Sequence, residues 1–253
     1  MCGRYATTRN DPDLAELFDA VVITPGPGPS WNVAPTDPVP VVRMSRSREA
    51  RVLDAARWGL VPPWAADMRG AARMINARVE TAAQKPAFRR ALKTRRCILP
   101  ADGWYEWQRG PEHKQPYFTH FRDGSSIALA GLWEFWKPKD DPEGEYADGL
   151  VTCAVLTTDA VGPLAQVHDR MPLVLPPSAW EAWLNPDRTP DDEAVAALLT
   201  PPSPDLVAQM ELRPVSPRVN NVRNNGPELL EALPPDQVAE PLQLDLLAGP
   251  NPQ

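Results

Sequence analysis

Cys2 is the residue whose type and position allow the most distinctive chemistry, in the opening segment MCGR. A side chain as small as cysteine at position 2 allows removal of Met1, which leaves a terminal cysteine with a free amine and a thiol. Their ordinary pKa values are roughly 7.7–8.0 and roughly 8.5, so we expect neutral amine and some thiolate at physiological pH. Such a pair condenses with an aldehyde to an imine and then closes a thiazolidine ring. The alternative, an incidental terminal cysteine, is favoured on MCG alone.

Two further segments carry amide, guanidinium and carboxyl groups. INARVET contains Asn76, Arg78 and Glu80 at alternate positions, which share one face if the segment is extended. An amide can position a nucleophile, and a guanidinium binds phosphate through paired N–H groups; the alternative is a polar strand edge with a local salt bridge. In ADGWYEW, Glu106 lies among aromatic residues, so desolvation would raise its pKa toward the range useful for acid–base catalysis. Alternatively, Glu106 points outward from a strand whose aromatic side chains face the core.

Three weaker signals come from a histidine and two loops. VHDRMPLVL places His168 and Arg170 just before an apolar strand, and histidine is the natural proton carrier near neutral pH. A lone histidine is, however, more often structural. SWNVAPT, with Asn32, predicts a loop that lines a groove. WGLVPPWAAD places Trp64 after two prolines, where an exposed indole can stack on a base; core packing is the alternative.

The charge distribution is uneven along the chain. The net charge is −7, yet residues 1–122 carry 19 Lys+Arg and 12 Asp+Glu, whereas residues 123–253 carry 7 and 21. Local clustering matters more than the total for phosphate binding, so the first half is the candidate for nucleic-acid contact. A chance asymmetry of an ordinary solvated surface explains the charges equally well.

The cysteine and histidine positions argue against disulfides and metals. Three cysteines form an odd, sparse set, and Cys97 and Cys153 lie in apolar runs where we expect them to be buried and inert. No Cys-x-x-Cys occurs and the three histidines are scattered, so no metal or other cofactor is expected. No apolar run approaches the roughly 20 residues that span a bilayer, and the polar first residues do not resemble a signal peptide. We therefore expect a cytoplasmic protein without membrane association.

The predicted elements favour an α+β protein. Strands are predicted at 38–44, 97–107, 116–121, 126–135, 150–157 and 171–176, and helices starting at Asp11–Pro12, with Asp11 as N-cap, and at 86–93, 178–184 and 190–199. Strands and helices do not alternate regularly, which argues against a doubly wound sheet. We predict one domain, residues 1–225, of curved, mainly antiparallel, barrel-like sheets with short flanking helices. Residues 226–253 are predicted to be an extension that is at least partly disordered.

Taken together, these segments resemble the SOS response-associated peptidase (SRAP) family, the abasic-site processing proteins. The matching segments, in chain order, are MCGRY, WNVAPT, RWGLVPPW, INARVET, ADGWYEW, KQPYF, HDRMPLVL and PVSPRVNNVRNN. The resemblance implies an α+β fold with a positively charged groove for single-stranded DNA. It also implies a thiazolidine crosslink between the mature terminal cysteine and a ring-opened abasic sugar, which shields the lesion, and a peptidase-type removal of Met1.

The same resemblance assigns roles to individual residues. Cys2 is the nucleophile, and Asn76 positions its amine and thiol. Glu106 opens the sugar hemiacetal and shuttles protons, and His168 assists proton transfer and reversal of the crosslink. The DNA contacts carried over are Arg4, Asn32, Trp64, Arg78 and Arg170. The aromatic loop departs from some members, because only Trp64 follows the two prolines. The expected partner is single-stranded DNA with abasic sites, bound by a monomer that associates with the nucleoid when on DNA.

Two other classes of protein remain open at this point. An amidohydrolase with an amino-terminal nucleophile, such as a glutaminase, also exposes a cysteine after MCG and uses the free amine as base. A non-covalent DNA-binding module, or a reader of a modified base, would use the basic first half without needing Cys2. The other matching segments argue against the first alternative, and covalent capture would exclude the second.

Overall fold

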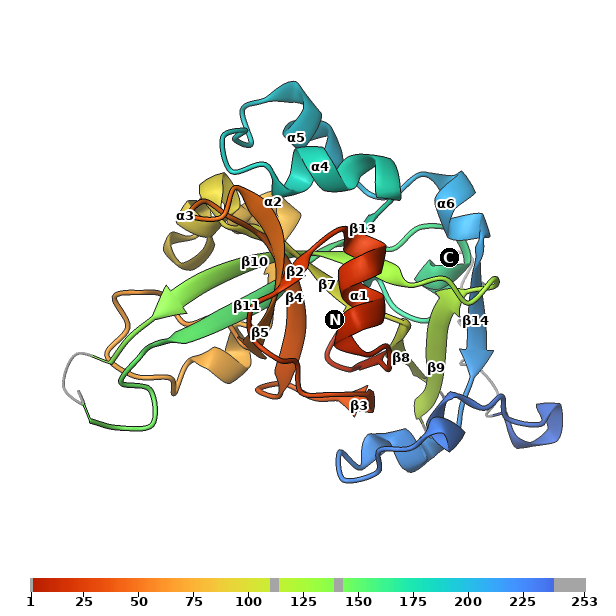
Figure 1. The fold of residues 1–253 in the computed structure, drawn as a ribbon. Helices are drawn as coiled ribbons and strands as arrows, with labels where there is room; N and C mark the ends of the chain where they lie inside the picture. The colour runs from red at the N-terminus through yellow and green to blue at the C-terminus, as the bar shows by residue number, and fades with distance from the viewer. Residues whose placement is uncertain (1, 110–113, 139–142, 239–253) are drawn as a thin grey trace, which may run out of the picture.

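The computed structural model describes residues 2–109, 114–138 and 143–238, which fold around two β-sheets (Figure 1). The smaller sheet has five strands, in the order β14 (Met210–Pro214), β9 (Lys114–Phe121), β8 (Gly103–Arg109), β1 (Tyr5–Thr7) and β3 (Ser30–Val33). All its pairings are antiparallel. In Figure 1, β9 and β14 stand at the right of the molecule.

The larger sheet has nine strands and closes partly on itself. Its main path is β12 (Arg170–Pro172), β11 (Leu150–Asp159), β10 (Ile127–Trp136), β7 (Arg96–Ala101), β4 (Pro38–Ser45), β5 (Ala50–Trp58) and β2 (Val21–Val22). Off this path, β13 (Val174–Leu175) pairs with β10 and β6 (Asn76–Arg78) pairs with β11. Because β11 also pairs in parallel with β5, the strands β11, β10, β7, β4 and β5 form a ring. The expected α+β fold with mainly antiparallel, curved sheets is confirmed.

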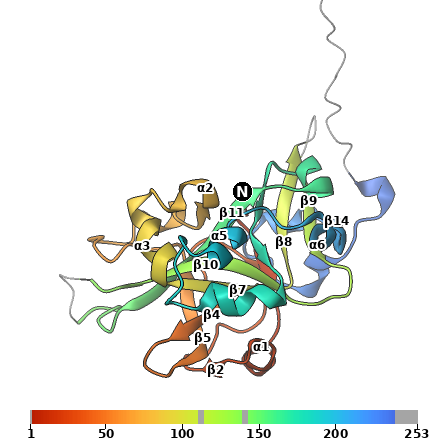
Figure 2. The same ribbon diagram turned by 90° about the horizontal axis from the view of Figure 1, so that it is seen from above.

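Short helices surround this ring. They are α1 (Asp11–Phe18), α2 (Val79–Ala82), α3 (Pro86–Thr94), α4 (Trp180–Leu184), α5 (Glu193–Leu198) and α6 (Pro204–Ala208). The 3-10 helices are η1 (Ala71–Arg73), η2 (Gly162–Gln166), η3 (Pro177–Ala179), η4 (Pro217–Asn220), η5 (Pro227–Leu230) and η6 (Pro235–Gln237). In the view from above, α2 and α3 lie on the side away from β8, β9 and β14 (Figure 2).

Alternation along the ring strands produces two hydrophobic clusters. The inner cluster takes one face of each strand, with Val39, Val41, Ala56, Cys97, Leu99, Leu129, Cys153 and Val155. The outer cluster takes the other face and packs against Phe18 of α1, Phe88 of α3 and Trp183 of α4. Helices α1 to α5 pack against this outer cluster, whereas Val207 of α6 packs with the inner one. Successive strand residues point to opposite faces, so both faces of these strands are apolar and buried. Cys97 and Cys153 are buried, as expected.

Several predicted boundaries change for identifiable reasons. The predicted strand 97–107 is two strands in different sheets, because the chain turns at Asp102, whose carboxylate accepts from the backbone N–H of Thr8. The first helix is capped by Asn10 rather than Asp11: the Asn10 side chain accepts from the N–H of Asp13. The last predicted helix begins later, at Glu193, because Asp192 caps it.

The predicted segment 178–184 combines η3 with α4, and 171–176 divides into β12 and β13. The predicted helix 86–93 matches α3 closely. Strands β1, β2, β3, β5 and β14 were not predicted, and β3 corrects the loop that was predicted for SWNVAPT. In the predicted extension, Leu229 is buried and Ala232 forms a bridge with Val215, so its first residues pack beside the smaller sheet. Its remainder from residue 239 lies outside the described residues, and the boundary at 225 stays a prediction.

Replacing Gly131 on β10 with alanine tests how tightly the side chains of the ring strands are packed. A Cβ at this position would lie 3.0 Å from the Cys97 Sγ and 3.1 Å from the carbonyl oxygen of Ala154, and would collide with Leu99. We expect Gly131→Ala to lower the free energy of unfolding by about 1–3 kcal/mol, measured by denaturant titration. Gly70→Ala is the control, because its Cβ would meet only the flexible end of Met74. Equal midpoints for the two variants would contradict this packing.

Candidate active site

The register between β1 and β8 places the start of the chain inside the protein. Tyr5 pairs with Trp104, Ala6 pairs with Gly103, and the N–H of Tyr105 donates to the carbonyl of Arg4 at 2.9 Å. Continuing this antiparallel register brings the chain start alongside Glu106. Cys2 is fully buried and belongs to the inner cluster of the ring.

Asn76 fixes the backbone of Cys2 from the opposite side. Its Nδ2 donates to the Cys2 carbonyl oxygen at 2.6 Å. Parallel pairing of β6 with β11, in which Asn76 lies opposite Val155, sets its position. The Oδ1 of Asn76 is buried and accepts no hydrogen bond from any described residue. Leaving a buried acceptor without a hydrogen bond costs about 1–3 kcal/mol of folding free energy. A donor that enters the site and bonds to this oxygen would recover that free energy.

Glu106 is a buried carboxyl beside the Cys2 thiol. Alternation on β8 puts it on the same face as Trp104, which packs in the inner cluster with Cys2. The outward orientation, the alternative considered from the sequence, is therefore wrong. Burial raises the pKa of Glu106 to about 7, with a smaller contribution from Asp169.

The same environment changes the expected state of the thiol. Burial raises the pKa of the Cys2 thiol well above its ordinary value, and the nearby charge of Glu106 raises it further. The expectation of some thiolate at physiological pH is thus wrong for the buried residue. The site holds a neutral thiol next to a carboxyl that titrates near neutrality.

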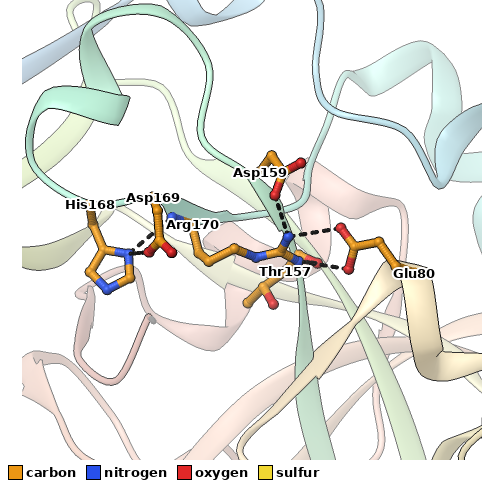
Figure 3. Close-up of polar contacts among 6 residues, drawn as sticks. All are labelled: Glu80, Thr157, Asp159, His168, Asp169 and Arg170. Atoms are coloured by element: carbon orange, nitrogen blue, oxygen red, sulfur yellow. Dashed lines mark hydrogen bonds and ion pairs between the residues drawn. The ribbon is translucent and has the colours of Figure 1, made fainter.

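His168 lines an open cavity of about 400 Å³ together with Glu106, Trp107, Lys114 and Asn220. Its Nδ1 accepts from the backbone N–H of Arg170 at 2.9 Å and lies 2.7 Å from the Asp169 carboxylate (Figure 3). The first contact requires a bare Nδ1 and the second a protonated one, so the two contacts belong to different protonation states. Glu106 both lines this cavity and acts electrostatically on the Cys2 thiol, so it connects the cavity with Cys2.

Arg170 is held in an ion-pair network rather than presented to solvent. Figure 3 shows its guanidinium between Glu80 and Asp159, and it donates to Glu80 at 2.8 and 3.0 Å, to Asp159 at 2.6 Å and to the Thr157 carbonyl at 2.7 Å. Its side chain is only 8% exposed. A direct phosphate contact, as predicted from sequence, would require these contacts to open. The ion pairs hold the Arg170 side chain, and its own backbone N–H donates to His168.

The INARVET segment is not extended throughout, which corrects the expected shared face. Asn76 and Arg78 are in β6, but Glu80 lies in α2. Glu80 pairs with Arg170, and this hydrogen bond holds the pKa of the Glu80 carboxyl below its usual range. Arg78 is exposed, as a phosphate contact requires.

The remaining predicted DNA contacts differ in accessibility. Trp64 is 53% exposed, which fits an aromatic side chain available for stacking. Asn32 is buried: its Oδ1 accepts from Arg4 at 2.7 Å, and its Nδ2 donates to carbonyls of the 219–224 loop. Its amide is fully engaged, so direct contact with DNA is not what the geometry favours. Asn32 instead holds the partly buried Arg4, whose guanidinium lies 6.0 Å from the Trp107 ring.

Sequence reasoning missed several residues around the site. Lys114 and Asn220 line the cavity, and Asn220 accepts from the Trp107 indole N–H at 2.7 Å. Both lie in or beside segments that matched the resemblance, KQPYF and PVSPRVNNVRNN, and this was the available signal. Asp159 and Thr157, the partners of Arg170, follow no recognisable motif.

The described part of the chain contains no group of three or more His, Cys, Asp or Glu side chains arranged to hold a metal ion. Among its helices, none combines the length and the apolar character needed to cross a membrane.

The fold and the site define a class of protein: a single α+β domain that buries a cysteine at its amino-terminal end between an amide and a carboxyl, beside an open cavity. A model of the SOS response associated peptidase (SRAP) family matches residues 1–222, and the chain belongs to this family.

Named relatives agree with this placement, and solved structures show a similar fold. The chain is 39% identical to the abasic site processing protein YoqW of Bacillus subtilis, over 92% of this chain and all of the relative. It is 34% identical to the abasic site processing protein YedK of Escherichia coli, over 91% of this chain and 99% of the relative. A phage-related protein from Bordetella bronchiseptica has a similar structure, with TM-score 0.63 and 28% identity over 85% of this chain and 94% of that one. A protein from Bacteroides thetaiotaomicron shares the fold, with TM-score 0.76 and 23% identity over 92% of this chain and all of that one.

The raised pKa of Glu106 predicts a pH-dependent stability penalty. Between the ordinary value of 4.5 and about 7, the unfolded chain releases this proton and the folded protein retains it, so folding stability falls as the pH rises through that window. Glu106→Gln removes the penalty. We expect the stability of the variant relative to wild type to rise by roughly 2 kcal/mol between pH 5 and pH 8 in denaturant titrations. Glu16→Gln, at an exposed position of α1, is the control; identical pH profiles for both variants would show that Glu106 is not desolvated.

Proposed function

We propose that this protein processes abasic sites in single-stranded DNA by forming a thiazolidine crosslink between mature Cys2 and the ring-opened sugar. The observation that carries the proposal is the placement of Cys2: its carbonyl is held by Asn76 at 2.6 Å, and its thiol lies in the electrostatic field of a carboxyl whose pKa is about 7. The names of the relatives, which are abasic site processing proteins, support the same substrate.

The proposed chemistry begins with hydrolysis of the bond between Met1 and Cys2, which frees the Cys2 amine. Glu106 in its protonated form gives a proton to the ring oxygen of the sugar hemiacetal, its carboxylate takes the proton of the anomeric hydroxyl, and the sugar opens to an aldehyde. The amine adds to the aldehyde carbon, and water leaves to form an imine. The thiol sulfur then bonds to the same carbon, its proton passes to the nitrogen, and the five-membered ring closes. One water is consumed in removing Met1, and one is released in forming the imine.

The electrostatics of the site favour this order of steps. A thiol whose pKa is raised by burial is a poor first nucleophile, because the thiolate is the reactive form. The amine, with an ordinary pKa of roughly 7.7–8.0, is partly neutral near pH 7 and adds first. Asn76 offers its unpaired Oδ1 to that amine. Glu106 then gives its proton to the imine nitrogen, and the resulting carboxylate takes the thiol proton.

We assign the DNA contacts by exposure. Arg78 binds a phosphate next to the lesion, and Trp64 stacks on a neighbouring base. Arg170 and Asn32 act behind the surface, by positioning His168 and Arg4. His168, on the wall of the cavity, transfers protons during formation and reversal of the adduct.

Replacing the nucleophile tests the central step. We expect wild-type protein, lacking Met1 by intact mass spectrometry, to form a band with an abasic-site oligonucleotide that survives a denaturing gel. Cys2→Ala should form no such band while retaining non-covalent binding, because phosphate contacts supply most of the affinity. Cys97→Ala, which removes another buried thiol, should still form it. An adduct that persists in Cys2→Ala would overturn the mechanism.

The same experiment separates the alternative classes. Wild-type protein with a free Cys2 and no adduct would favour a binding module or an amidohydrolase. Ammonia release from glutamine would then distinguish between these two.

The acid–base role of Glu106 predicts a slower and differently pH-dependent reaction in its variant. Glu106→Gln should reduce the rate of adduct formation by roughly 10²–10⁴-fold. The wild-type rate should bend near pH 7, falling as the protonated carboxyl is lost, and the variant should lack that bend. Single-turnover gels from pH 5.5 to 8.5 measure both, with Glu16→Gln as the control. An unchanged rate would remove Glu106 from the mechanism.

A further inference from the structure

A second cavity, of about 440 Å³, lies where the end of β4 approaches the end of α3 and the middle of β10. Arginine side chains dominate its lining, which includes Arg43, Arg46, Arg90, Arg95 and Trp133. It shares no lining residue with the cavity that contains Glu106 and His168. Nothing in the chemistry proposed for Cys2 uses these residues.

Two of the arginines are held in place by buried carboxylates. Arg43 donates from Nε and Nη2 to Asp54 at 3.1 and 2.7 Å, and Arg95 pairs with Glu134. Asp54 and Glu134 are both buried and both lie behind the cavity lining. The two guanidinium groups also lie over the ring of Trp133, at 4.5 and 5.1 Å from its centre. Ion pairs and cation–π contacts thus fix the orientation of these donors before any ligand arrives.

The other two arginines are exposed and form no close ion pair with a buried carboxylate of the described residues, although the charge of Arg90 acts on Glu134. Arg90 is exposed and forms no ion pair within the part of the chain that the structure describes. Arg46 lies 3.4 Å from Asp187, but both side chains are well exposed, and such pairs contribute little. Among the described residues that line the cavity, none is acidic. The cavity lining therefore combines two exposed guanidinium groups with two that are held by buried carboxylates.

We propose that this arginine cavity binds a phosphate group. Guanidinium groups bind phosphate through paired N–H donors, and a phosphate has enough oxygens to engage several of them at once. The volume matches a ligand of nucleotide size. The phosphate belongs either to a free mononucleotide or to a DNA strand. The inference goes beyond the proposed function and does not require Cys2 to react.

The test measures binding to Cys2→Ala protein by titration calorimetry at fixed ionic strength. The probes are inorganic phosphate, a deoxynucleoside monophosphate and an undamaged single-stranded oligonucleotide. Arg46→Gln and Arg90→Gln, singly and together, remove the exposed guanidinium groups and leave the ion pairs of Arg43 and Arg95 with the buried carboxylates in place. Arg89→Gln is the matched control, because Arg89 is exposed on the same helix but does not line the cavity.

We expect saturable binding that weakens at least tenfold in Arg46→Gln/Arg90→Gln and changes less than twofold in Arg89→Gln. Loss of mononucleotide and phosphate binding supports a small ligand, whereas loss confined to the oligonucleotide supports a strand; both support the site. Absence of saturable binding by every probe overturns the proposal. So does an equal loss in Arg89→Gln, which would indicate unspecific surface charge. The proposed function is tested separately, by assaying whether proteins that keep Cys2 and carry the same arginine substitutions still crosslink an abasic oligonucleotide.

Discussion

The structure depends on the pairing of the first residues of the chain with β8. Terminal residues usually fray, because few contacts hold them. In this protein Tyr5 and Ala6 are fully buried, the Tyr5 ring packs edge-on against Trp58 at 5.2 Å, and the backbone of Arg4 accepts from Tyr105. Because β1 (Tyr5–Thr7) is held inside the smaller sheet, the residues just before it also lie in the interior, and Cys2 is fully buried. A terminus thereby becomes the most constrained part of the site.

Burial then determines the protonation states that the site can hold. A thiol and a carboxyl that share an apolar environment both resist ionisation, and each negative charge raises the pKa of the other group. Near neutral pH, Cys2 is therefore a thiol and Glu106 is close to half ionised. A group that can both give and take a proton at working pH suits a reaction that needs an acid to open a sugar and a base to accept the thiol proton.

The fold class could be predicted from the sequence, whereas the orientation and burial of the candidate site residues could not. Long apolar strands such as β10 and β11 are evident from composition, whereas β5, which mixes Arg and Asp with Val and Leu, is not. Motif spacing identified Asn76 and Glu106, but alternation could not decide which face Glu106 takes, because both faces of β8 are buried. Arg170 appeared to be a phosphate contact, since its partners Glu80 and Asp159 are distant in sequence and only the folded chain brings them together.

The excess of positive charge in the first half of the chain is a second case in which the sequence does not show how side chains are paired in the folded protein. Arg96 is buried, donates five hydrogen bonds to backbone carbonyls and has its pKa lowered by burial to about 10, so it stabilises the fold and faces no partner. Arg43 and Arg95 are paired with buried carboxylates, so their charge is largely balanced although both still line the arginine cavity. A count of charges therefore overstates the groups available to phosphate. The electrostatic argument for nucleic-acid binding has to rest on individual exposed guanidinium groups such as Arg78, whose charge reaches solvent.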